Sequence, residues 1–122
     1  MLYFVPTPIG NLNDISLRAL SVLRECEILF CEDTRIAKSL INLLNKRFDA
    51  NINIQKFISL HTHNEDEILS KIELEIFDKN VAFLSDAGMP GISDPGAALV
   101  NFAIKNSIAY EVLSGSNAVS YT

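Results

Sequence analysis

The sequence predicts an α/β fold, an open, mainly parallel five-stranded sheet with helices on both faces. Three observations favour it. Short apolar runs alternate with helix-period stripes about five times along the 122 residues, which indicates parallel pairing through right-handed crossovers. Each apolar run ends in a polar or glycine-bearing cluster. The composition, 48% hydrophobic and 20% charged, is typical of one globular domain.

Five short apolar runs are expected to form the strands. The first run has no room for a helix before Pro6, and the fourth stops abruptly at Ser85-Asp86. The runs are residues 2–5, 27–31, 54–60, 81–84 and 110–113.

Four apolar stripes with helical spacing are expected to form the helices. A cap at Asp14 or Ser16 starts the first, and Asp94-Pro95 starts the fourth, with Asp as N-cap and Pro in the first turn. The fourth helix should be the best buried, and residues 45–53 should form a loop. The stripes are Leu17, Leu20 and Leu23; Ile36, Ala37, Leu40, Ile41 and Leu44; Ile68, Leu69, Ile72 and Ile76; and residues 97–104.

The clusters that follow the strands are the candidate ligand site. In a parallel sheet all carboxyl ends lie along one edge, where ligands bind, so the clusters should converge. In the longest cluster, Gly88, Gly91 and Gly96 permit close backbone approach to a ligand. An ordinary wide turn is the alternative. The clusters are residues 6–13, 32–35, 61–64, 85–94 and 114–117.

Several kinds of site are excluded or disfavoured. The sequence has no G-x-G-x-x-G after its first strand, no P-loop and no G-x-S-x-G nucleophile elbow. His61 and His63 lie near acidic residues, but alternate loop residues rarely converge on a metal, so no metal is expected. Cys26 and Cys31 match no redox or zinc spacing and are interpreted as structural thiols.

The chain shows neither a membrane span nor a signal peptide, so a cytoplasmic protein with no membrane partner is expected. Its net charge of −5 is uneven: residues 1–56 carry seven Lys/Arg against six Asp/Glu, and residues 57–122 carry three against nine. If a polyanion binds, it should contact the more basic half. The alternative is a solvated helix surface. The relevant cations are Arg35, Lys38, Lys46 and Arg47.

Four segments carry a resemblance to a known family. LYFVPTPIGNLNDISLRAL, CEDTR at residues 31–35, LHTHNE at residues 60–65 and SDAGMPGISDPG occur in order and correctly spaced. Together they resemble the tetrapyrrole methylase superfamily, and most closely its ribosomal RNA small subunit methyltransferase I branch. One departure is visible: the family's Pro-Gly-Pro after the fifth strand is replaced by Ser114-Gly115-Ser116, which puts the stiffness of that loop in doubt.

The resemblance implies S-adenosylmethionine as donor and a ribose 2′-hydroxyl of 16S rRNA in the small ribosomal subunit as acceptor. It implies two α/β domains with the donor between them, a homodimer, and a sheet order of about 3-2-4-1-5. Residues 1–122 match the N-terminal domain only. The chain stops as a further crossover begins, so we expect a fragment that lacks the C-terminal domain and is inactive alone.

The same resemblance, with the chemistry of the loops, assigns site residues. Glu32, Asp33 and His61 are weak candidates for a base. Gly10, Asn11 and Arg35 are assigned to substrate, and whether the first loop touches donor or acceptor stays open. Arg35 would pair with a phosphate or with Glu32, and a plain structural ion pair is an equal alternative. Asp86 would bind the donor or cap its own loop. The full set assigned to the donor is Asp86, Ala87, Gly88, Ile92, Ser93, Ser116 and Ala118.

Two alternatives stay open. A tetrapyrrole (precorrin-type) methyltransferase would share the fold and the donor, but PTPIGNL and CEDTR speak against it. A receiver-like or flavodoxin-like binding module would transfer no methyl group, and a receiver would need acidic residues where this chain has Pro6 and His61. The nucleotide modified, the base and the dimerisation of the fragment are not determined by the sequence.

Overall fold

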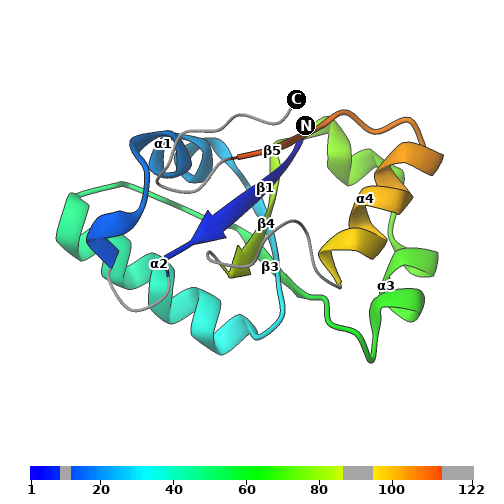
Figure 1. The fold of residues 1–122 in the computed structure, drawn as a ribbon, viewed down its shortest axis with the longest axis horizontal. Helices are drawn as coiled ribbons and strands as arrows, with labels where there is room; N and C mark the ends of the chain where they lie inside the picture. The colour runs from blue at the N-terminus through cyan, green and yellow to red at the C-terminus, as the bar shows by residue number, and fades with distance from the viewer. Residues whose placement is uncertain (9–11, 87–94, 114–122) are drawn as a thin grey trace.

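A five-stranded sheet forms the centre of the molecule (Figure 1), with the strand order β3-β2-β4-β1-β5. The computed structural model describes residues 1–8, 12–86 and 95–113, with only the backbone of Asp86. All four described strand pairs are parallel, which confirms the predicted fold class and the implied order. The strands are β1 (Leu2–Thr7), β2 (Ile28–Cys31), β3 (Lys56–Ser59), β4 (Val81–Asp86) and β5 (Tyr110–Val112).

Helices cover both faces of this sheet, as predicted (Figure 1). Helices α1 and α2 pack on one face, and α3, α4 and the 3₁₀ helix η2 pack on the other. The helices are α1 (Leu17–Glu25), α2 (Thr34–Phe48), α3 (Glu65–Lys71) and α4 (Gly96–Lys105), with 3₁₀ helices η1 (Leu12–Asp14) and η2 (Leu74–Asp78).

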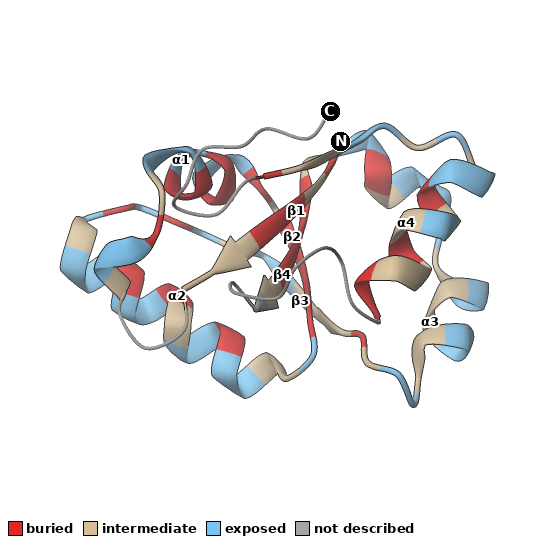
Figure 2. Ribbon diagram, viewed as in Figure 1, coloured by how far each residue is buried: buried red, intermediate tan, exposed pale blue. Residues whose placement is uncertain are grey.

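The core consists of two layers, one on each side of the sheet. Because successive side chains of a strand point to opposite faces, Val5 and Leu84 pack towards α1 and α2, whereas Phe4 and Phe83 pack towards α3 and α4. The buried residues of Figure 2 follow the strands through the middle of the molecule. Strands buried on both faces read as continuous apolar runs, which is why the sequence shows them without alternation.

The start of α1 is decided by Ser16. Its Oγ accepts a hydrogen bond from the backbone N–H of Ala19 at 3.0 Å, the usual arrangement of an N-cap. Asp14 instead ends η1. The predicted cap at Asp94 lies outside the described residues.

Strand β1 continues through Pro6 to Thr7, two residues further than predicted. The carbonyl of Phe4 accepts from the N–H of Leu113, on the β5 side of the strand. Pro6, two residues on, faces the same side at a position beyond the end of β5. Its missing N–H therefore breaks no hydrogen bond of the sheet.

Helix α2 also runs further than predicted, and the expectation of a loop from residue 45 is wrong. It continues to Phe48 and ends at Asp49, which adopts the left-handed conformation. The Asn45 side chain bonds the Ile52 backbone twice, donating to its carbonyl at 2.9 Å and accepting from its N–H at 2.8 Å. This pair satisfies polar groups of the turn and folds the chain back after the helix.

The third predicted stripe is split between two elements. Helix α3 ends at Lys71, Ile72 is extended, and the remainder of the stripe falls in η2. Both parts still pack on the same layer of the core. We attribute the break to burial of Phe77, whose ring stacks on Phe30 with centroids 6.3 Å apart.

Helix α4 is less buried than predicted. It buries Gly96, Leu99 and Ala103, but Ile104 is 61% exposed. Helix α1 buries four of its nine residues. The apolar sequence of α4 on nearly every side therefore does not translate into burial, because only one side of the helix contacts the sheet and α3.

Candidate functional site

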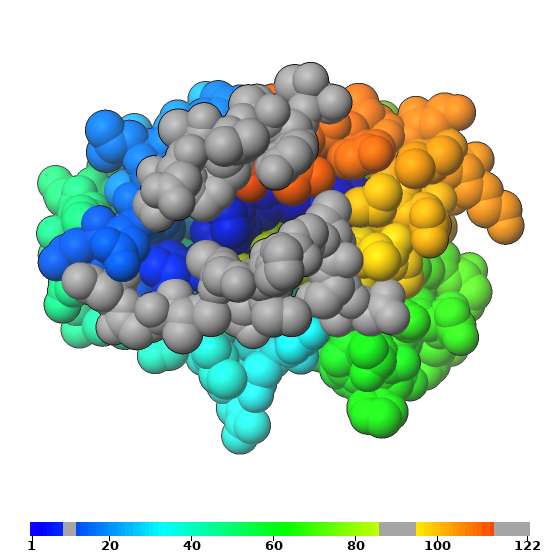
Figure 3. All heavy atoms as spheres, in the orientation of Figure 1, coloured from blue at the N-terminus to red at the C-terminus, as the bar shows by residue number. Residues whose placement is uncertain are grey.

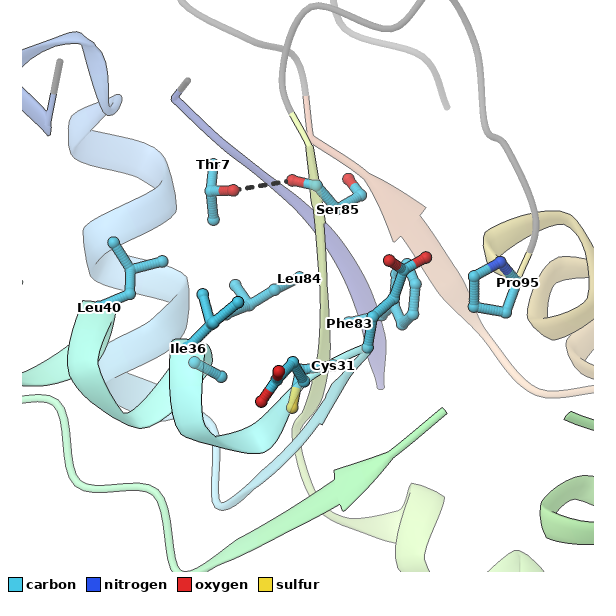
Figure 4. A pocket seen from close by; sticks show the side chains of 11 residues that line it. Thr7, Cys31, Ile36, Leu40, Phe83, Leu84, Ser85 and Pro95 are labelled. Carbon is cyan, nitrogen blue, oxygen red and sulfur yellow. Dashed lines mark hydrogen bonds between the residues drawn. The ribbon is translucent and has the colours of Figure 1, made fainter. Parts of the chain in front are cut away.

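The carboxyl ends of β1, β2 and β4 meet at one edge of the sheet. In the β1–β4 register, Pro6 is opposite Ser85 and Thr7 is opposite Asp86. The hydroxyl of Thr7 donates to the carbonyl oxygen of Ser85 at 3.0 Å (Figure 4). The predicted convergence is confirmed for these strands, whereas the residues after β5 lie outside the described part of the chain.

A pocket of about 240 Å³ opens at this edge. Ile36 and Leu40 of α2 form one side of it, and Pro95, at the start of α4, lies on the other (Figure 4). In the space-filling view (Figure 3), β1 is visible at the centre of the face, between α1 and α2 on one side and α4 on the other. The described residues that line the pocket are Thr7, Cys31, Glu32, Asp33, Ile36, Ala37, Leu40, Phe83, Leu84, Ser85 and Pro95.

Two carboxylates, Glu32 and Asp33, border the pocket where β2 ends. Asp33 is the N-cap of α2, and its Oδ1 accepts from the backbone N–H of Arg35 at 2.9 Å. Hydrogen bonds from the side chain and then the backbone of Arg35 lower the pKa of Asp33 below its usual range. A carboxylate with a lowered pKa is a poor proton acceptor but a good hydrogen-bond acceptor.

Arg35 lies beside the pocket and is not one of its lining residues. Its guanidinium is 3.4 Å from Asp33 Oδ2, yet the side chain is 91% exposed. An ion pair so open to water contributes little to stability. The structure thus contains a structural ion pair of Arg35, but its partner is Asp33 and not the expected Glu32. The remaining donors of Arg35 face solvent.

His61, the third candidate base, belongs to a turn that follows β3. The ring Nδ1 of His61 accepts from the backbone N–H of His63 at 3.2 Å. The backbone N–H of His61 donates to Asn64 Oδ1 at 2.7 Å. The turn is joined to the pocket edge through Ser59, whose Oγ donates to the Glu32 carbonyl at 3.1 Å. His61 is not among the lining residues, and its role as a base stays a prediction.

Of the described lining residues, sequence reasoning assigned only Glu32 and Asp33 to the site. Four of those that it missed lie at the strand ends and on α2. Thr7 and Ser85 are at the strand ends, and their place in the predicted clusters was the available signal. Ile36 and Leu40 belong to a helical stripe that was interpreted as core. Ile36 is in fact 68% exposed, because the first turn of α2 projects past the end of the sheet.

Cys31 also lines the pocket, with its thiol buried. Burial raises its pKa to about 11, and the charge of Asp33 acts in the same direction. Burial likewise raises the pKa of Cys26 to about 12. Both thiols are therefore protonated near neutral pH, which agrees with their interpretation as structural residues.

Most residues assigned to the donor lie outside the described ranges, and their roles stay predictions. Only the backbone of Asp86 is described, at the end of β4 opposite Thr7. The others are Ala87, Gly88, Ile92, Ser93, Ser116 and Ala118, and the same holds for Gly10 and Asn11.

Comparison with known proteins identifies the family. The model of the tetrapyrrole (corrin/porphyrin) methylases matches residues 1–121. The chain belongs to this family.

Curated relatives within the family share one name, "Ribosomal RNA small subunit methyltransferase I". The chain is 59% identical over 120 residues to the protein from Campylobacter fetus, covering 98% of the chain and 44% of the relative. It is 52% identical over 127 residues to that from Helicobacter pylori strain J99, with the same shares. For Mesomycoplasma conjunctivae, identity is 46% over 116 residues, covering 94% of the chain and 46% of the relative. The chain thus spans less than half the length of these relatives.

The described lining of the pocket is acidic. It includes Glu32 and Asp33 but neither Lys nor Arg. The hydroxyls of Thr7 and Ser85 and the apolar side chains of Ile36 and Leu40 give it both polar and apolar surface.

Two further properties concern the described ranges alone. None of the helices there has the length and apolar character that a bilayer crossing requires. Nor do three or more His, Cys, Asp or Glu side chains gather there as metal ligands would.

Proposed function

We propose that the protein containing this chain is an S-adenosylmethionine-dependent methyltransferase that methylates a ribose 2′-hydroxyl of 16S rRNA. The observation that carries the proposal is the acidic pocket at the ends of β1, β2 and β4 in a chain of the methylase family. The names of relatives up to 59% identical support the RNA acceptor. The ribose 2′-hydroxyl rests on the resemblance of PTPIGNL and CEDTR to that branch.

On the donor side, the loop after β4 is proposed to hold S-adenosylmethionine through Asp86, Ala87, Gly88, Ile92 and Ser93. Ser116 and Ala118 would add backbone contacts. When bound, the donor supplies a methyl group already activated by its sulfonium. The task left to the chain is to align the acceptor oxygen with that methyl group, and positioning of this kind contributes up to about 7–11 kcal/mol in model reactions.

On the acceptor side, Asp33 is proposed to accept a hydrogen bond from the ribose hydroxyl and to orient its oxygen. Its lowered pKa favours this over proton removal. The hydroxyl proton becomes strongly acidic only as the new C–O bond forms, so the base is needed late. Glu32, exposed at the pocket edge, is the candidate for that step, with His61 as the second. Gly10, Asn11 and Arg35 would contact the substrate around it.

The wider organisation follows from the same proposal. Residues 1–122 would be the N-terminal domain of a two-domain enzyme, which fits the 44% of the relative's length that the chain spans. The donor would lie between the domains of a homodimer. The small ribosomal subunit would be the partner, so the enzyme would act in the cytoplasm without a metal.

The direct test uses the full-length protein with tritiated S-adenosylmethionine and small subunits from cells that lack the gene. We expect one labelled ribose, located by mass spectrometry of nuclease fragments, and loss of labelling with Glu32→Gln or Asp33→Ala. Glu75→Gln, in η2 on the other face of the sheet, is the matched control. Binding of S-adenosylmethionine without any label in RNA would contradict the proposal that RNA is the acceptor.

A second candidate acceptor is a tetrapyrrole, because the matching family is described by its corrin and porphyrin methylases. The same reaction with a precorrin-type macrocycle in place of subunits tests it. Label in the macrocycle and none in RNA would replace the first proposal. Absence of donor binding would remove both and leave a non-catalytic binding module.

A further inference from the structure

We propose that the exposed side of α2 is the surface on which the phosphate backbone of the acceptor RNA lies. We call this surface the basic face of α2. The inference rests on the proposed function and extends it, since it names how the polyanion is held beside the pocket. The basic face consists of Arg35, Lys38, Ser39, Asn42 and Lys46.

The charge of α2 is unlike that of the rest of the chain. The protein has 15 Asp and Glu against 10 Lys and Arg, with a net charge of −5. The 15 residues of α2, TRIAKSLINLLNKRF, contain four of these cations and no carboxylate. A polyanion approaching an acidic protein is therefore attracted to this helix.

Helical spacing gathers these side chains on one side. Residues 35, 38, 39, 42 and 46 follow the three- and four-residue steps of a helix surface. The buried residues Ala37, Ile41 and Leu44 lie on the opposite side, against the sheet. Figure 2 shows the outward side of α2 as exposed, and in Figure 3 the start of α2 projects from the edge of the molecule.

The cations of the basic face are only weakly engaged within the protein. Arg35 pairs with Asp33 at 3.4 Å while remaining 91% exposed. Lys38 lies over the ring of Phe57, 5.4 Å from its centroid, which steadies its stem beside β3. No ion pair of Lys46 is found across the described ranges. Like charges three or four residues apart repel on a helix, and bound phosphates would relieve that repulsion.

The basic face leads to the pocket. At about 1.5 Å per residue, Arg35 and Lys46 are about 16 Å apart along the helix, enough to contact several phosphates of one strand. On an adjacent side of the same helix, Ile36 and Leu40 line the pocket. An RNA strand held along the basic face would therefore pass the mouth of the pocket, with its riboses within reach.

The other helical layer does not suit a polyanion. Helix α3 has three acidic residues in its first turn, Glu65, Asp66 and Glu67. Its one cation, Lys71, is paired with Glu67 at 3.1 Å. The charge difference between the two layers thus assigns RNA to the α2 side.

The test measures binding of a fluorescent 16S rRNA transcript to the full-length protein as salt concentration is varied. Replacing both Lys38 and Lys46 with Gln should weaken binding about tenfold at moderate salt and reduce the slope of log K against log[salt] by about 1.4, at about 0.7 per phosphate contact. Asn42→Lys, on the same face, should increase both affinity and slope. The control replaces Lys71 and Lys105, on α3 and α4, with Gln.

Three outcomes would overturn the inference. The first is an equal salt-dependence slope for the Lys38/Lys46 variant and the Lys71/Lys105 control; the proposed function would still stand if labelled RNA is formed. The second is an RNA affinity of Asn42→Lys that equals that of the wild type. If the variant loses binding to intact subunits but not to naked transcript, the partner of α2 is a ribosomal protein. Calorimetric binding of S-adenosylmethionine, measured in parallel, tests the proposed function separately.

Discussion

The hydroxyl of Thr7 donates to the carbonyl oxygen of Ser85 at 3.0 Å, joining two residues that are 78 positions apart in the chain. This bond lies at the edge where β1 and β4 end together. The Thr7 side chain supplies an extra link between these strands near their carboxyl ends.

Replacing Thr7 with Val preserves the shape of the side chain but removes the hydroxyl that donates the hydrogen bond to Ser85. We expect a loss of about 0.5–1.5 kcal/mol in the free energy of unfolding, the usual contribution of one hydrogen bond, measured by urea titration. The free energy of binding S-adenosylmethionine should fall by more than the free energy of unfolding, because the strand ends shift when this hydrogen bond is lost. Thr62→Val, in the exposed turn after β3, is the control, and equal effects of both substitutions would contradict this account.

Asp33 should make stability depend on pH. Arg35 holds the pKa of Asp33 below its usual range. The charge of Asp33 therefore stabilises the folded protein fully at pH values above the unfolded-state pKa. It is lost as pH falls through the lowered folded-state value. Asp33→Asn retains capping ability and removes the charge. The difference in Tm between wild type and this variant should shrink from about pH 6 to about pH 2; a constant difference would contradict the prediction.

The two buried thiols should be unreactive in the native protein. Burial raises the pKa of Cys31 to about 11 and that of Cys26 to about 12, so the thiolate is scarce near neutral pH. Their contribution to stability is present below the unfolded-state pKa and declines as pH rises beyond it. Labelling with a disulfide reagent should proceed at the rate of unfolding. Rapid labelling of either thiol in the folded protein would contradict the assignment.

Phe30 should be among the most costly core residues to truncate. It is fully buried in β2 and stacks on Phe77, so Phe30→Ala should destabilise by about 3–5 kcal/mol. The control is Leu17→Ala, in the first turn of α1, where the side chain is 84% exposed and the change should be small. Denaturant unfolding of both variants gives the comparison.

The sheet could be predicted because its central strands are buried on both faces. Runs such as residues 81–84 have no polar interruption, and each is followed by a cluster of polar residues or glycine. Their parallel pairing puts Thr7, Ser85 and Asp33 at one edge, so the position of the site follows from topology alone. The sheet order came from the family resemblance.

What the sequence did not predict depends on contacts between distant residues. β1 extends past Pro6 because it stays paired with β4 to Thr7, while β5 stops opposite Phe4 and leaves the missing N–H of Pro6 without consequence. The end of α2 depends on Asn45 reaching Ile52. Ile36 has the spacing of a core residue, but its exposure depends on how far α2 extends past the sheet. The break between α3 and η2 depends on Phe77 being buried with its ring stacked on Phe30.

Binding of the methyl donor tests the central claim most directly. We would titrate the full-length protein with S-adenosylmethionine by calorimetry, and repeat the titration with Asp86→Ala and with Asp78→Ala, at the end of η2. The account predicts saturable binding by the wild type and by Asp78→Ala, and an affinity at least about tenfold lower for Asp86→Ala, a loss of about 1.4 kcal/mol. Absence of binding, or equal affinity of all three proteins, would contradict it.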